Sequence, residues 1–102
     1  MVSKQKIEGL EVNLAKTLDI STVQALYAEL RATLDKGTPI ILYGTAVTHV
    51  DTSALQVLAA MFVYADEHQC ELRLESPSDV LVKTAALLGL AAHIGIEVRE
   101  TA

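Results

Sequence analysis

Residues 39–65 read PIILYGTAVTHVDTSALQVLAAMFVYA. The apolar run at 39–43 is short and lies between a proline and Gly44, which predicts a buried strand. Residues 44–53 are rich in small and hydroxyl side chains, which predicts a loop. The apolar sequence that follows predicts a helix over residues 53–68. A buried strand, a loop and an apolar helix in this order are typical of an α/β fold.

The segment that precedes this unit predicts one more strand and one more helix. Residues 6–14 contain two short apolar pieces with strand-like alternation. Ser21 and Gln24 form a capping-box pattern, and apolar residues at helical spacing follow them. We therefore expect a first helix that begins near Ser21 and ends before Gly37.

The segment that follows predicts a strand, a helix and a closing strand. Residues 71–75 alternate between charged and apolar side chains, as a half-buried strand does. Ser76 is expected to cap a third helix, with Pro77 at the first helical position and Gly89 at the end. Alternating apolar residues at 94–98 predict the closing strand.

Strands that alternate with helices predict an α/β fold class with a mixed β-sheet, mostly parallel after the first strand or two. We expect about four or five strands covered by three or four helices. The chain has 102 residues, which is the length of one domain. Hydrophobic residues make up 51% of it and charged residues 21%, which argues against disorder. We therefore expect a single domain over residues 1–102.

Charge and cysteine content exclude several classes of protein. The formal net charge is −5 and the eight basic residues are scattered, whereas a nucleic-acid binder needs clustered Lys and Arg. The single cysteine, Cys70, excludes a disulfide framework within the chain, and we interpret it as a half-buried thiol at a strand edge. The polar N-terminus lacks a signal-peptide pattern, and no apolar run reaches the roughly 18–20 residues that span a bilayer. We therefore expect a cytoplasmic protein without direct membrane insertion.

Residue types used in catalysis and metal binding occur near the loop, but at unsuitable spacing. His49, Asp51 and Ser53 are the types found in a nucleophilic triad, yet they are crowded on one short loop. His49, His68 and Cys70 follow no known metal-ligand spacing. The sequence also has no glycine-rich phosphate-binding motif. We therefore expect no enzyme activity, no metal and no cofactor.

The second predicted helix has an unusually apolar composition. Gln56 is the only polar side chain in residues 54–65 apart from the hydroxyl of Tyr64. A helix that covers a sheet normally has a polar outer face. If one apolar side of this helix faces the sheet, Val57 and Met61 point elsewhere. They are covered either by a neighbouring helix or by a partner protein, since exposed apolar patches usually mark interaction sites.

The start of the same helix has a surplus of capping residues. Asp51, Thr52 and Ser53 are all good N-caps, and one helix needs only one of them. Redundant capping is one interpretation. The other is that a hydroxyl here is phosphorylated, because free N–H groups and the helix dipole favour an anion. A phosphate adds about −1.5 to −2 charges, which would weaken docking without unfolding the domain.

The sequence at this helix start resembles the STAS family, the domain of bacterial anti-sigma factor antagonists and of sulfate-transporter tails. The residues that carry the resemblance are 50–55 (VDTSAL), after a buried strand and a small-residue loop, and 18–20 (LDI) before the first helix. The order of elements agrees over nearly the whole chain, which implies a STAS fold. In such proteins a partner kinase phosphorylates the position of Thr52. Asp19 and Asp51 match acidic residues near that site, and Ala54 replaces a family glycine.

The leading hypothesis is a non-enzymatic signalling module that binds a partner protein and is switched by phosphorylation of Thr52, with Ser53 as second candidate. The resemblance implies a histidine-kinase-like anti-sigma factor, a switch kinase or a chemotaxis component as partner. One alternative is a constitutive subunit on the ATPase of a phospholipid-transport ABC system, and a weaker one is nucleotide binding at the same helix start. A homodimer is left open. The expected partner-binding residues are Asp19, Asp51, Thr52, Ser53, Gln56, Val57 and Met61.

Overall fold

The structure, a computed structural model, describes residues 9–96. Strands and helices alternate along this part of the chain, as the sequence predicts. In chain order they are β1 (Leu10–Asn13), β2 (Thr17–Leu18), α1 (Ile20–Asp35), β3 (Ile40–Tyr43), β4 (His49–Val50), α2 (Thr52–Glu67), β5 (Leu72–Glu75), α3 (Asp79–Leu87) and the 3₁₀ helix η1 (Ala92–Ile94). No helix within residues 9–96 combines the length and hydrophobicity that crossing a bilayer requires.

The strands form two small sheets. β1, β3 and β5 pair in the order β1-β3-β5, and β2 pairs with β4 in a separate two-stranded sheet. Every strand pair in residues 9–96 is parallel. The α/β class is as expected, but the larger sheet has three strands rather than four or five. The first expected strand covers 6–14, and its described part is β1, while residues 6–8 lie outside the described residues.

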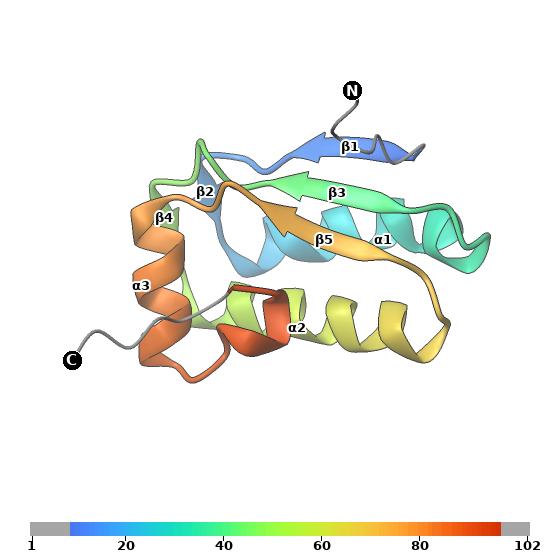
Figure 1. Cartoon of the computed structure of the whole chain (residues 1–102). Helices are drawn as coiled ribbons and strands as arrows, with labels where there is room; N and C mark the ends of the chain where they lie inside the picture. Colours follow the sequence, from blue (N-terminus) through green and yellow to red (C-terminus); the bar gives the residue numbers. More distant parts are fainter. Residues whose placement is uncertain (1–8, 97–102) are drawn as a thin grey trace, which may run out of the picture.

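The helices α1 and α2 lie side by side on one face of the larger sheet, and α3 stands at its end near β4 (Figure 1). Successive strand side chains point to opposite faces, so each row of paired residues shares a face. The row Leu10–Ile40–Leu72 is largely apolar, whereas the next row places Glu11 and Arg73 on the opposite face. On the central strand β3, Ile40 and Leu42 share the apolar face and are fully buried in the hydrophobic core. The core therefore lies between the sheet and the two helices.

Two helices begin at residues that the capping patterns did not predict. α1 is capped by Asp19 rather than through the Ser21–Gln24 pattern. α3 is capped by Ser78, whose Oγ accepts a hydrogen bond from the Leu81 N–H at 3.2 Å. Ser76, the expected cap, instead adopts a left-handed backbone with φ of 49°. The two residues that follow β5 are needed to turn the chain before α3 can begin.

The closing strand expected at 94–98 is wrong for its described part. Ala92–Ile94 form the 3₁₀ helix η1, and Val98 lies outside the described residues. Ile94 and Ile96 are both buried, so their two-residue spacing reflects burial around a turn and not a strand. The turn is closed by Gly95, which has φ of 79°, a conformation that glycine adopts without strain. η1 packs against α2, so the last described segment completes the core.

Cys70 is more deeply buried than the expected half-buried thiol. Its side chain is 6% exposed, in the segment that leads into β5. Its Sγ lies 3.4 Å from the main-chain oxygen of Thr38. Burial raises the pKa of the thiol, so its neutral form is favoured.

Candidate functional site

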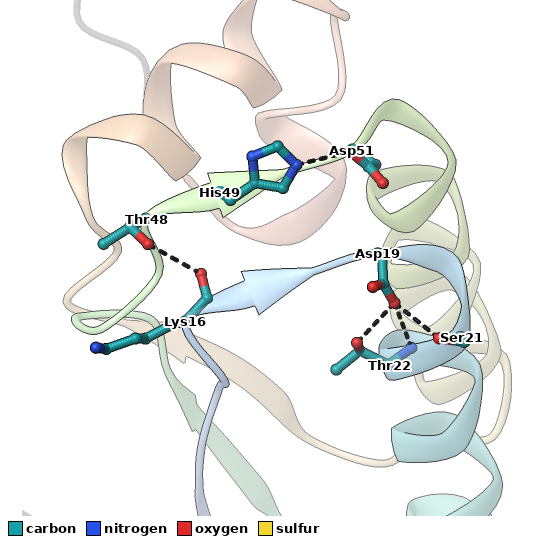
Figure 2. Close-up of polar contacts among 7 residues, drawn as sticks. All are labelled: Lys16, Asp19, Ser21, Thr22, Thr48, His49 and Asp51. Atoms are coloured by element: carbon teal, nitrogen blue, oxygen red, sulfur yellow. Dashed lines mark hydrogen bonds and ion pairs between the residues drawn. The ribbon is translucent and has the colours of Figure 1, made fainter.

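Pairing of the two shortest strands brings two helix starts together. In the β2–β4 ladder Leu18 lies opposite Val50, and the Asp51 N–H donates to the Leu18 carbonyl at 2.9 Å. β2 leads directly into α1 and β4 into α2. The next residue on each strand is therefore an aspartate at the N-cap position of a helix. Figure 2 shows Asp19 and Asp51 on these adjacent helix starts.

The carboxylate of Asp19 caps α1. One of its oxygens, Oδ1, accepts hydrogen bonds from the Thr22 N–H at 2.8 Å, the Thr22 hydroxyl at 2.7 Å and the Ser21 hydroxyl at 2.9 Å. These bonds, with the Thr22 hydroxyl contributing most, lower the pKa of Asp19 from 3.8 to about 2. The side chain is therefore a firmly anionic group beside the start of α2 at neutral pH.

Asp51 occupies the N-cap position of α2 as expected, but its side chain makes no capping hydrogen bond. Its Oδ1 lies 3.0 Å from His49 Nε2, and both side chains are substantially exposed (Figure 2). The Ala54 N–H, which a capping carboxylate would accept from, donates instead to the Asp51 main-chain oxygen at 3.1 Å. The residue is thus in the predicted place, while its carboxylate has a different partner.

Two hydroxyls follow Asp51, and they differ in accessibility. Thr52 is the first residue of α2 and is exposed, whereas Ser53 is half-buried. Both stand in the first turn of the helix, where N–H groups lack intrahelical partners. Thr52 is therefore the more accessible hydroxyl for a modifying enzyme.

The outer face of α2 continues from Thr52 along the helix. Thr52, Gln56, Ala60 and Val63 are exposed and recur at helical spacing, so they form one stripe, which we call the α2 stripe. Val57 is half-buried beside this stripe. Ala60 and Val63 were not among the predicted contact residues, although continuing the helical spacing from Thr52 and Gln56 would have found them. Val63 is 48% exposed.

The prediction that Met61 belongs to a docking surface is wrong. Its side chain is fully buried in the core. Met61 lies on the same helical face as Tyr64. The Tyr64 ring packs edge-on against Tyr27 of α1, and its centroid is 4.7 Å from Cζ of Arg31, also on α1. The neighbouring helix α1 therefore covers this side of α2, which was the other interpretation of the apolar composition.

Comparisons with known proteins identify the family and the fold of the chain. The STAS domain model matches residues 1–102. The chain belongs to the STAS family. Among solved structures, the NMR structure of the protein TM1081 is similar, with a TM-score of 0.74 and 19% sequence identity over 91% of this chain and 77% of that one. At this identity the likeness concerns the fold alone. No curated protein matches the chain.

Family membership confirms the STAS resemblance and the STAS fold. STAS domains are generally regulatory or partner-binding modules and not enzymes. The two adjacent helix starts lie in the segments 18–20 and 50–55 on which the sequence resemblance was based. Residues 9–96 hold no group of three or more His, Cys, Asp or Glu side chains that would bind a metal ion. His68, one of the residues considered as a ligand, uses its Nδ1 in a contact with the Tyr64 main-chain oxygen at 2.9 Å.

Proposed function

We propose that this STAS domain is a non-enzymatic signalling module whose docking surface spans the two adjacent helix starts and the α2 stripe. Phosphorylation of Thr52 switches docking off. The observation that carries the proposal is that Thr52 is exposed at the first position of α2, directly after Asp51 and beside the helix start that Asp19 caps. Phosphorylation of Thr52 requires a partner kinase that uses ATP, and we therefore propose that the interaction takes place in the cytoplasm.

The electrostatics of the helix start support a phosphate switch. The free N–H groups and the dipole of α2 favour an added anion at Thr52, so the modified domain stays folded. The phosphate brings about −1.5 to −2 charges to a surface that already has the carboxylates of Asp19 and Asp51. A partner that docks onto this surface must then remove water from the phosphate while the carboxylates of Asp19 and Asp51 lie nearby. This desolvation costs free energy, so docking is weakened.

The composition of the surface supports a protein partner. Beyond Thr52 the α2 stripe offers the neutral amide of Gln56 and the apolar side chains of Ala60 and Val63. Its exposed apolar positions suit a partner with an apolar groove, since exposed apolar patches usually mark interaction sites. A histidine-kinase-like anti-sigma factor or switch kinase and a chemotaxis component are the candidate partners. The proposed contact residues are Asp19, Asp51, Thr52, Ser53, Gln56 and Val57.

The first experiment locates the modification. The domain is incubated with a candidate kinase and ATP, and phosphorylated residues are mapped by mass spectrometry. We expect modification at Thr52 that is lost in Thr52→Ala and retained in Ser53→Ala. Modification confined to residues outside 52–53 would contradict the switch.

The second experiment measures docking to the same kinase by titration calorimetry. Thr52→Glu adds a charge, and Thr52→Gln, of almost equal size, does not. We expect Thr52→Glu to weaken binding about tenfold relative to Thr52→Gln, equivalent to about 1.4 kcal/mol. Equal affinities for the two variants would refute the electrostatic mechanism. If the domain instead binds a transport ATPase, is not phosphorylated, and binds more weakly in both variants, the alternative of a constitutive transport subunit is favoured.

A further inference from the structure

The two adjacent helix starts use the same residue type differently. At α1 the Thr22 N–H donates to the Asp19 carboxylate at 2.8 Å. At the equivalent position of α2, the Ala54 N–H donates to the main-chain oxygen of Asp51 at 3.1 Å, and the Asp51 carboxylate contacts His49. Both aspartates have extended backbones, with ψ of 177° and 149°. The two caps therefore share the extended backbone class, with φ of −117° and −91°.

The neighbouring side chains of the two caps also differ. Asp19 is held over α1 by the hydroxyls of Ser21 and Thr22 in addition to the N–H bond. Ala54, which stands where α1 has Thr22, has no hydroxyl to donate. His49 lies two residues before Asp51, and its counterpart in the β2–β4 ladder is Thr17, whose shorter side chain carries no imidazole. Asp51 thus lacks one of the donors that hold Asp19 and has a competing donor that Asp19 lacks.

We propose that His49 is a positioning residue that holds the Asp51 carboxylate away from the α2 N-terminus and so keeps Thr52 open to modification. The Nε2–H of His49 donates to Asp51 Oδ1, at the 3.0 Å separation that the structure gives. Without this donor, Asp51 rotates to accept the Ala54 N–H, as Asp19 accepts that of Thr22. A carboxylate on the first turn then competes with the incoming phosphate for the same N–H groups. This consequence for Thr52 rests on the proposed function, whereas the positioning of Asp51 does not.

The positioning is tested by NMR on the unmodified domain. In His49→Ala we expect the Ala54 amide to shift and its hydrogen exchange to slow about fivefold, equivalent to about 1 kcal/mol of added capping. We also expect the melting temperature to rise by a few degrees, although a surface contact has been deleted. His49→Gln should resemble the parent, because its amide N–H replaces the imidazole donor. The double variant His49→Ala/Asp51→Ala should lose both effects.

The outcomes separate a positioning role from a structural one. An unchanged Ala54 amide in His49→Ala, or a stabilisation that persists in the double variant, overturns the proposal. The rate of Thr52 phosphorylation by the candidate kinase is then compared in the same variants. We expect a several-fold lower rate in His49→Ala and the parental rate in His49→Gln, and equal rates would overturn the link to Thr52. Absence of Thr52 phosphorylation in every variant would instead refute the proposed function, while the NMR result still decides the role of His49.

Discussion

Met61 provides the most direct test of how α2 is divided between core and docking surface. Its side chain is fully buried in the structure, although Val57 and Tyr64 on the same helical face are only partly covered. Met61→Ala removes the three heavy atoms beyond Cβ from a closely packed interior. Substitutions of this kind cost roughly 2–5 kcal/mol, from lost burial and from the cavity left behind. The slightly better helix propensity of alanine offsets only a few tenths of this.

The matched control is Val63→Ala, two positions further along the same helix. Val63 is 48% exposed, so its truncation should change the free energy of unfolding by no more than about 0.5 kcal/mol. Urea unfolding followed by circular dichroism gives this free energy for both variants. For Met61→Ala we expect a melting temperature lower by about 8 °C or more, from the usual shift of 4–8 °C per kcal/mol.

Partner binding should show the opposite order. Val63→Ala alters the exposed α2 stripe and should weaken docking, whereas Met61→Ala should leave the affinity of the folded fraction unchanged. If Met61→Ala lowers the free energy of unfolding by less than about 1 kcal/mol, as little as Val63→Ala does, the burial of Met61 is refuted. Weaker docking by a fully folded Met61→Ala variant would restore Met61 to the interface.

Two further predictions concern the elements that position the site. The pKa of Asp19 is about 2 in the folded protein, against an ordinary value of 3.8. The ionised carboxylate therefore contributes its full stability above pH 3.8, and this contribution is lost as the pH falls from 3.8 through 2. The melting temperature of the parent should therefore fall more steeply over this window than that of Asp19→Asn, and equal slopes would show that the carboxylate is not held by Ser21 and Thr22. Gly44 directly follows β3, and an added Cβ there would lie 2.9 Å from Leu81 Cδ2 and 3.2 Å from Pro77 Cα. Gly44→Val should therefore destabilise the domain by about 1–3 kcal/mol in urea unfolding. The exposed neighbour Ala46→Val is the control, and an equal effect of the two substitutions would contradict the close packing at Gly44.

Periodic segments of the chain were predicted well because their information is local. Alternation in residues 71–75 and helical spacing after Ser21 depend on which side of one element is buried. Irregular boundaries were predicted less well. Several cap residues stand before α1 and α3, and the choice among them depends on where the preceding strand ends. The Ser78 N–H, for example, donates to the Gly44 carbonyl at 3.0 Å, a contact with a residue far away in the sequence.

The candidate site was predicted as a list of residues but not as a geometry. The cap surplus at 51–53 and the resemblance at 50–55 pointed to Thr52, and family membership now confirms the resemblance. The contact between His49 and Asp51 was not predicted, because the residue type of His49 was considered only for a triad and a metal site. A spacing pattern does not contain the side-chain orientations that bring His49 Nε2 to 3.0 Å from Asp51 Oδ1.

The sequence by itself determined the α/β class, the order of most elements and, to within the cap candidates 51–53, the start of α2, because hydrophobic periodicity and cap chemistry act over a few neighbouring residues. Only the tertiary structure decided which apolar side chains of α2 are covered. Met61 is buried because α1 packs on its side of α2, whereas Val63 belongs to the α2 stripe and is 48% exposed. The tertiary structure also decided that Asp19 and Asp51 are neighbours, since strand pairing joins residues that are distant in the chain.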